Sequence, residues 1–116
     1  MALSIQEKKH VGCIELALSG SALTEDDFSP LISKSNGLAA SGNSRLILNL
    51  EGIHLLNSLG ISALIRIFTR CRNTGGDLYV VNISDKISQV LLLTKLNTVL
   101  NIAPSVEEAV SKFKAE

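Results

Sequence analysis

The sequence predicts a single α/β domain whose mixed, mostly parallel β-sheet is covered by about four α-helices. Short apolar runs alternate along the chain with longer segments of helical period, an order typical of parallel sheets with right-handed crossovers. The 116 residues are enough for one domain with a substantial core, and 46% of them are hydrophobic while 19% are charged. We therefore expect one globular domain over residues 1–116, with the element order β-β-α-β-α-β-α-β-α.

Two strands open the chain. Residues 3–9 (LSIQEKK) alternate weakly between polar and apolar, whereas residues 13–20 (CIELALSG) alternate strongly. In the second strand Leu16 and its apolar neighbours two positions away point to one face, and Glu15 points to the other. A turn at residues 10–12 joins the two, so the first strand is expected to be an antiparallel edge.

The first helix is predicted to begin at Thr24, because three acidic residues follow it and suit the positive end of the helix dipole. Ser29 and Pro30 could equally serve as the cap and the first helical residue. Gly37, Gly42 and the serines near them predict the end of this helix.

Three further strands are expected. Residues 45–50 (RLILNL) and 77–83 (DLYVVNI) are almost continuous apolar runs, which are typical of strands covered on both faces. Residues 98–102 (TVLNI) predict a last, short strand.

The final two helices have clear starting signals. Ser84 and Asp85 predict the start of one, and Ser105 with Glu108 forms the S-x-x-E capping box of the other. Four residues at helical spacing predict the buried stripe of the last helix: Val106, Ala109, Val110 and Phe113.

The stretch EGIHLLNSLGISALIRIF, residues 51–68, predicts a helix from about residue 59 to 74 with Ser58 as its N-cap. Its apolar face is expected to contain Ile61, Leu64, Ile65, Phe68 and Cys71. Its polar face is expected to carry the arginines Arg66 and Arg70 in solvent. Gly75 and Gly76 predict the stop.

Ser58 is the candidate functional residue. The N-terminus of a helix has free N–H donors and a positive partial charge, so a phosphate on Ser58, with a charge of about −1.5 to −2, meets a favourable field. Capping alone would also explain a serine there. Leu55, Leu56 and Leu59 flank Ser58, and we expect at least one of them to be exposed, as in a protein contact site.

Several functions are excluded. The net charge is zero and no basic stripe follows any segment, so nucleic-acid binding is not expected. The apolar runs are far shorter than the roughly 20 residues of a membrane span, and the N-terminus lacks a signal-peptide pattern, so we expect a cytoplasmic protein. No metal-ligand spacing and no cofactor motif occur, and Cys13 and Cys71 are expected to be buried, reduced thiols.

Catalysis is not expected either. A hydrolase elbow needs G-x-S-x-G, but the chain reads LNSLG around Ser58, with His54 four residues away and no evident acid partner. Neither G-x-x-x-x-G-K-[ST] nor G-x-G-x-x-G occurs, so direct nucleotide binding is not predicted.

The chain resembles the STAS family, which includes bacterial anti-sigma factor antagonists. Family members have a strand, then D-S-S-G or D-S-T-G, then a helix rich in Leu and Ile, and here RLILNLEGIHLL leads into NSLGI, residues 57–61. The segments at 18–24 (LSGSALT), 75–84 (GGDLYVVNIS) and 105–110 (SVEEAV) also resemble the family, so the likeness covers nearly the whole chain.

The resemblance implies a function. Such proteins bind an anti-sigma factor that is also a serine kinase, which phosphorylates the serine at the helix start; a phosphatase resets the protein. Ser58 matches that phosphoacceptor serine. The partner-binding residues are then expected to be Leu55, Leu56, Asn57, Ser58, Leu59, Gly60 and Arg66.

The sequence departs from the family pattern at three positions. Asn57 stands where an Asp is usual, Leu59 where a small residue is usual, and Thr24 replaces the acid of the early turn. The first two departures favour an alternative, a non-switching STAS scaffold or accessory subunit of a larger regulatory or transport assembly. Homo-oligomer formation also remains open.

Overall fold

The computed structural model describes residues 3–22 and 24–115. The ends of the predicted 1–116 domain, and Leu23 within the 18–24 segment, lie outside this part of the chain. In chain order the elements are β1 (Leu3–His10), β2 (Cys13–Gly20), α1 (Glu25–Ala40), β3 (Arg45–Gly52), α2 (Ser58–Asn73), β4 (Asp77–Val81), α3 (Asp85–Leu93), the 3₁₀ helix η1 (Leu96–Thr98), β5 (Asn101–Ala103) and α4 (Val106–Ala115).

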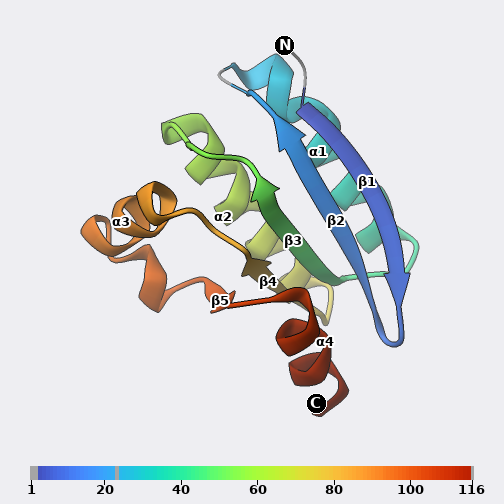
Figure 1. Ribbon diagram of the computed structural model, residues 1–116. Coiled ribbons are helices and arrows are strands. Elements are labelled where there is room, and N and C mark those ends of the chain that lie inside the picture. The colour runs from blue at the N-terminus through green and yellow to red at the C-terminus, as the bar shows by residue number, and fades with distance from the viewer. Residues whose placement is uncertain (1–2, 23, 116) are drawn as a thin grey trace.

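The strands form one five-stranded sheet in the order β1-β2-β3-β4-β5 (Figure 1). The β1 and β2 strands pair antiparallel through a tight turn in which Gly12 has a φ of +84°, and all later pairs are parallel. Each parallel connection passes through a helix, as crossovers require. The predicted α/β architecture with β1 as its antiparallel edge is therefore confirmed.

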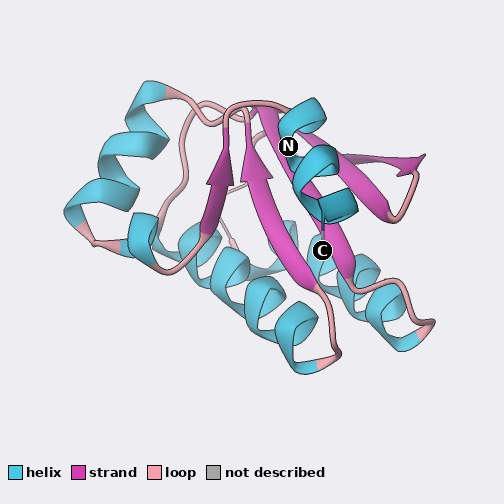
Figure 2. Ribbon diagram, turned by 90° about the horizontal axis from the view of Figure 1, so that it is seen from below, coloured by secondary structure: helices cyan, strands magenta, loops and turns pink. Residues whose placement is uncertain are grey.

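Helices cover the two faces of the sheet unequally. Figure 2 shows the long α1 and α2 side by side along one face, with α4 near the C label on the other side. The larger core lies between the sheet and α1, α2 and α3, and it includes the fully buried Leu16, Leu48 and Leu91. A smaller core under α4 contains Ile47, Val81 and Phe113, among others. The rest of that face is open, since Ser4, Gln6 and Lys8 of β1 and Ser19 near the end of β2 are exposed.

The first helix begins where an acidic first turn was expected, and it ends later. The Thr24 hydroxyl accepts a hydrogen bond from the Asp27 backbone N–H at 3.2 Å, and the Asp27 carboxylate accepts one from the Thr24 N–H, so Thr24 is the cap and Pro30 lies inside the helix. Gly37 does not end α1, contrary to expectation. A glycine in an exposed helical turn costs about 1 kcal/mol, which weakens a helix without stopping it. The helix ends at Ala40, just before Gly42 turns with a φ of +91°.

Two strand boundaries also differ from prediction. The fourth strand ends at Val81 rather than at residue 83, because Asn82 adopts a left-handed φ of +57°. The predicted strand at 98–102 is wrong in its first half, since Leu96–Thr98 form a 3₁₀ turn and pairing begins only at Asn101. Lys95, with a φ of +61°, turns the chain out of α3 and into that 3₁₀ helix.

The predicted starts of α3 and α4 are confirmed. The Ser84 hydroxyl accepts from the Ile87 N–H at 3.2 Å, and the Ser105 hydroxyl accepts from the Glu108 N–H at 3.2 Å. Within the stripe predicted for α4, Ala109 and Phe113 are buried, and the two valines are half-buried beside them.

The buried face of α2 is broader than the predicted stripe. Its buried residues are Gly60, Ala63, Leu64, Ile67, Phe68 and Cys71, whereas Ile61 and Ile65 are only half-buried. This helix packs against α1 as well as against the sheet, so the stripe expected for a single contact is shifted toward Ala63 and Ile67. Arg66 and Arg70 lie in solvent, as predicted.

Candidate functional site

The site lies at the connection between β3 and α2. The third strand ends at Gly52, residues 53–57 form a short loop, and Ser58 is the first residue of the helix. This is the edge at which the parallel strands have their carboxyl ends, the usual place for binding sites in open α/β sheets. Four helix N-termini of this chain follow strands at the same edge.

Asn57, not Ser58, caps α2. Asn57 has extended backbone angles of φ −88° and ψ −175°, and its Oδ1 accepts a hydrogen bond from the Gly60 N–H at 3.0 Å. The prediction that Ser58 is the N-cap is therefore wrong by one residue. Both residue types are good caps, and here the amide of Asn57 takes the position.

This shift leaves the Ser58 hydroxyl without a structural task. The residue is exposed, and its hydroxyl forms no hydrogen bond to any residue in the described part of the chain. It stands in the first turn of a sixteen-residue helix, where the N–H groups and the helix dipole favour negative charge. No acidic side chain lies in the first turn of α2, so nothing there already neutralises that field.

The leucines near Ser58 differ in how exposed their side chains are. Leu55 is 64% exposed, which confirms that at least one leucine of this loop lies in solvent. Leu56 and Leu59 are half-buried, and Ile53 anchors the beginning of the loop in the core. The result is a small apolar rim beside an exposed hydroxyl.

Gly60 lets three segments meet at the start of α2. A Cβ at this position would lie 2.7 Å from Cδ2 of Leu56 and 3.0 Å from Cζ of Phe28, which belongs to α1. Those distances are too short for an ordinary contact, so a side chain here would require the Leu56 and Phe28 side chains to shift. Close packing therefore favours glycine here, whereas its backbone conformation does not demand it, since its φ is not positive.

A second contact ties the loop to α3. The Ser84 hydroxyl donates a hydrogen bond to the His54 carbonyl oxygen at 2.7 Å. Its Oγ also caps α3, because it accepts a hydrogen bond from the Ile87 N–H. The loop that precedes Ser58 and the N-terminus of α3 are thereby held together.

A hollow of about 350 Å³ lies beside the site, between the N-terminal halves of α1 and α2. Its lining includes Leu59 and Arg66 from α2, and Glu25 and Asp26 from α1. Arg66 thus lies two helical turns beyond Ser58 on α2, and it lines the same hollow as the acidic Glu25 and Asp26. All seven predicted site residues, from Leu55 to Arg66, belong to this end of the molecule.

Sequence reasoning missed a buried polar cluster on the α4 side of the sheet. Glu15 is 3% exposed, and its two carboxylate oxygens contact His10 Nε2 at 2.8 Å and Asn49 Nδ2 at 3.0 Å. Asn49 was the available signal, since it is the one polar residue after Arg45 in the otherwise apolar run RLILNL.

The pKa of the Glu15 carboxyl is lowered, as the balance of opposing effects. Burial acts to raise the pKa, but the hydrogen bonds from Asn49 and His10 outweigh it, and the positive charge of Lys8 adds to them. The carboxylate is therefore ionised at neutral pH, and it is an acceptor only.

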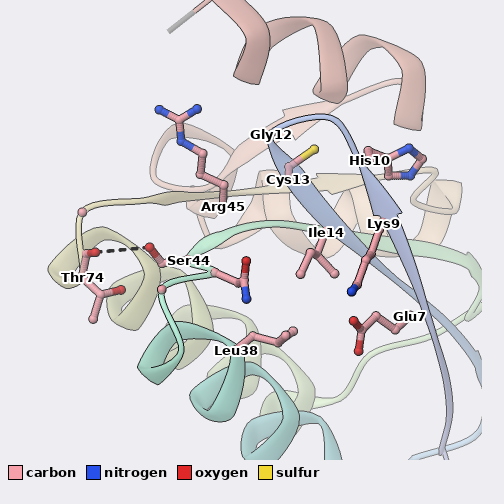
Figure 3. A pocket seen from close by; sticks show the side chains of 13 residues that line it. Glu7, Lys9, His10, Gly12, Cys13, Ile14, Leu38, Ser44, Arg45 and Thr74 are labelled. Carbon is pink, nitrogen blue, oxygen red and sulfur yellow. Dashed lines mark hydrogen bonds between the residues drawn. The ribbon is translucent and has the colours of Figure 1, made fainter.

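Another hollow, of about 700 Å³, lies at the opposite end of the molecule, beside the β1–β2 turn (Figure 3). Lys9 and Glu7 face one another there, whereas Arg45 points away from them toward α4, where its Nη1 lies 3.4 Å from the Phe113 carbonyl oxygen. Since Lys9 and Arg45 leave opposite faces of the sheet, their charges do not converge on one ligand. We assign no site to this hollow.

The two cysteines and the possible metal ligands do not form a further site among the described residues. Both cysteines are buried and unbridged, as predicted, and burial, with the nearby charge of Asp77, raises the pKa of Cys71 to about 12. Among residues 3–22 and 24–115, no group of His, Cys, Asp and Glu side chains is arranged to hold a metal ion. In that same part of the chain, no helix has the length and apolar character needed to cross a membrane.

Comparison with known proteins identifies relatives. The model of the STAS domain family matches residues 4–109. An anti-sigma factor antagonist from Mycobacterium paratuberculosis superposes with a TM-score of 0.84 at 18% identity, over 97% of this chain and 95% of that one. The anti-sigma factor antagonist SpoIIAA in its unphosphorylated form gives a TM-score of 0.80 at 16% identity, over 97% and 98% of the two chains.

A transporter contains a similar domain. The murine anion transporter Slc26a9, a solute carrier 26 family member, matches with a TM-score of 0.67 at 19% identity, over 88% of this chain but only 18% of the transporter. At such identities these likenesses concern the fold.

Proposed function

The chain belongs to the STAS domain family, and we propose that it acts as an anti-sigma factor antagonist that is switched by phosphorylation of Ser58. In this proposal it captures an anti-sigma factor with serine kinase activity, and thereby regulates transcription that depends on a sigma factor. The kinase phosphorylates Ser58 and then dissociates from the domain, and a phosphoserine phosphatase restores binding. The domain itself acts by binding and not by catalysis.

The observation that carries the proposal is the exposed Ser58 hydroxyl at the start of α2, free because Asn57 provides the cap. A kinase needs an accessible hydroxyl, and Ser58 is exposed; because no hydrogen bond within the described residues uses this hydroxyl, its modification breaks none. The helix N-terminus also stabilises the product, since it favours a dianion within its first turn.

The surface around Ser58 is suited to a protein contact. Leu55 supplies exposed apolar area, Leu56 and Leu59 supply half-buried area, and Arg66 adds a charge at the rim. Asn57 and Gly60 act indirectly, because they fix where the helix begins and how closely the loop approaches it.

Release follows from electrostatics without refolding. Roughly two negative charges on a hydroxyl that is desolvated in the complex cost several kcal/mol unless the partner supplies cations there. Since about 1.4 kcal/mol changes affinity tenfold, such a cost is sufficient to separate the two proteins.

The test is phosphorylation with the cognate kinase and ATP, followed by mapping of the modified residue by mass spectrometry. We expect incorporation at Ser58 in the wild type and none in Ser58→Ala. Ser62→Ala is the matched control, because Ser62 is an exposed serine one turn further along the same helix. Phosphate at other positions with Ser58 unmodified would refute the switch.

A second function is favoured by specific residues. Asn57 and Leu59 depart from the usual family pattern, and a similar domain occurs in a membrane transporter, so a non-switching scaffold or accessory subunit is the alternative. Ser58→Asp distinguishes the two. The switch predicts that this variant loses most of its affinity for the partner, measured by calorimetry, whereas a scaffold binds as tightly as the wild type.

A further inference from the structure

A chain of side-chain hydrogen bonds runs across three neighbouring parts of the sheet toward the Ser58 site. The Asn49 Nδ2 group donates to the Glu15 carboxylate at 3.0 Å. The Asn49 Oδ1 atom accepts from Asn82 Nδ2 at 3.1 Å and from the Glu51 backbone N–H at 3.0 Å. This series of hydrogen bonds therefore links β2, β3 and the segment that follows β4.

The orientation of the Asn49 amide is fixed by its neighbours. Glu15 is ionised and can only accept, so the NH₂ group of Asn49 has to face it. The oxygen of Asn49 then has to face the two donors, from Asn82 and Glu51. Asn49 is 9% exposed, and none of the buried side-chain polar atoms in the described part of the chain lacks a partner. Turning this amide over would break three bonds at once in a buried place, where each is costly to lose.

The hydrogen-bonded series is connected through the backbone to the loop before Ser58. Asn82 is the first residue after β4, and its left-handed φ of +57° sets the direction of the two-residue connection to Ser84. Ser84 in turn donates to the His54 carbonyl oxygen at 2.7 Å. His54 lies within the 53–57 loop, four residues before Ser58.

We propose that Asn49 and Asn82 are positioning residues for the Ser58 site. Through Asn82 and Ser84 they hold the 53–57 loop, and hence the apolar rim and the start of α2, in the conformation that presents the hydroxyl. The geometry stands on its own, and only the purpose of that conformation rests on the function proposed above.

The alternative is that these bonds simply stabilise the whole fold. The two roles differ in where the effect of a broken bond is felt. A bond that only stabilises the domain lowers the protection of all core amides equally, whereas a positioning bond loosens the loop more than the sheet. Hydrogen exchange of single amides in the full chain separates these outcomes without any partner or kinase.

Asn82→Gly is the variant of choice. Glycine accepts the left-handed φ without strain, so the substitution removes the amide group and leaves the turn possible. Lys95→Gly is the matched control, because Lys95 has nearly the same φ of +61°, is exposed, and donates no side-chain hydrogen bond within the described residues. Both variants add the same backbone freedom to the unfolded chain.

The measured quantity is the hydrogen-exchange rate of three amides, each compared with the rate of the Leu16 amide in β2. The Ile53 amide bonds to the Leu50 carbonyl oxygen. The Gly60 amide bonds to the Asn57 side chain, and the Ile61 amide bonds to the Asn57 carbonyl oxygen. In Asn82→Gly we expect these three to exchange roughly fivefold faster relative to Leu16, as the loss of one hydrogen bond predicts, with no such difference in Lys95→Gly. Equal acceleration of all four amides, or none, would overturn the proposal. Either result is independent of whether Ser58 is phosphorylated.

Discussion

The side-chain oxygen of Asn57 accepts the Gly60 backbone N–H at 3.0 Å, and this single bond separates two tasks that the sequence places on adjacent residues. Asn57 closes the N-terminus of α2, and Ser58 is left with an exposed hydroxyl. Modification of the serine therefore need not disturb the helix.

Asn57→Ala should lower the free energy of unfolding by about 1 kcal/mol, the usual loss when a helix cap is removed. Ser58→Ala should change it by less than about 0.5 kcal/mol, as for an exposed residue without a partner. Urea unfolding followed by circular dichroism measures both. Asn57→Ser is the control, since serine also caps and should retain most of the stability; a larger loss in Ser58→Ala than in Asn57→Ala would contradict the assignment.

Two glycine positions should respond in opposite directions to alanine. Gly60→Ala places a methyl group 2.7 Å from Leu56 Cδ2 and 3.0 Å from Phe28 Cζ, so we expect destabilisation of about 1–3 kcal/mol from overpacking. Gly37→Ala meets nothing within 4 Å in an exposed part of α1, and should stabilise the protein by about 0.5–1 kcal/mol. Thermal melts of the two variants give the comparison, and Gly60→Ala melting at or above the wild-type temperature would show that the loop yields easily.

Glu15 should make stability depend on pH in the acidic range. Its pKa in the folded protein lies below the ordinary value of 4.5, so the unfolded chain binds the proton more readily. The stabilisation is complete above pH 4.5 and is lost as the pH falls from there through the lowered pKa of the folded state. Urea titrations between pH 7 and 3 should show a smaller loss in Glu15→Gln than in the wild type, because other carboxyls contribute equally to both. Parallel curves would mean that Glu15 is not held in its ionised form.

Both thiols should be unreactive toward thiol reagents in the native protein. Burial chiefly raises the pKa of Cys71 to about 12, so at pH 8 only roughly one thiol in ten thousand is the reactive thiolate. Burial also raises the pKa of Cys13. Ellman's reagent should therefore react with neither cysteine in buffer and with both in urea. Rapid reaction of one thiol in the native state would show that its cover opens.

Much of this molecule follows from local patterns. The alternation in residues 13–20, the apolar runs at 45–50 and 77–83, and the helical spacing after Ser58 predicted the strands, helices and overall order. The caps at Ser84 and Ser105 followed from single residues and their spacing. These features depend on contacts between residues close in the chain, which a sequence displays directly.

Other features were decided by packing between distant segments. Asn57 and Ser58 are equally good caps by chemistry, so no local rule chooses between them. The closeness of Leu56 and of Phe28 from α1 to Gly60 is likewise visible only in the assembled structure. The buried face of α2 was shifted for the same reason, because it packs on α1 as well as on the sheet.

The polar chain from Glu15 to Asn82 is the clearest case. Its two side-chain bonds join residues 34 and 33 positions apart, and they exist only because β2, β3 and β4 lie next to one another. The sequence by itself determined the elements, their order and the serine at a helix start. The tertiary structure alone decided which residue caps that helix, how exposed the hydroxyl is and what holds its loop, because these depend on distances that arise only when the sheet has assembled.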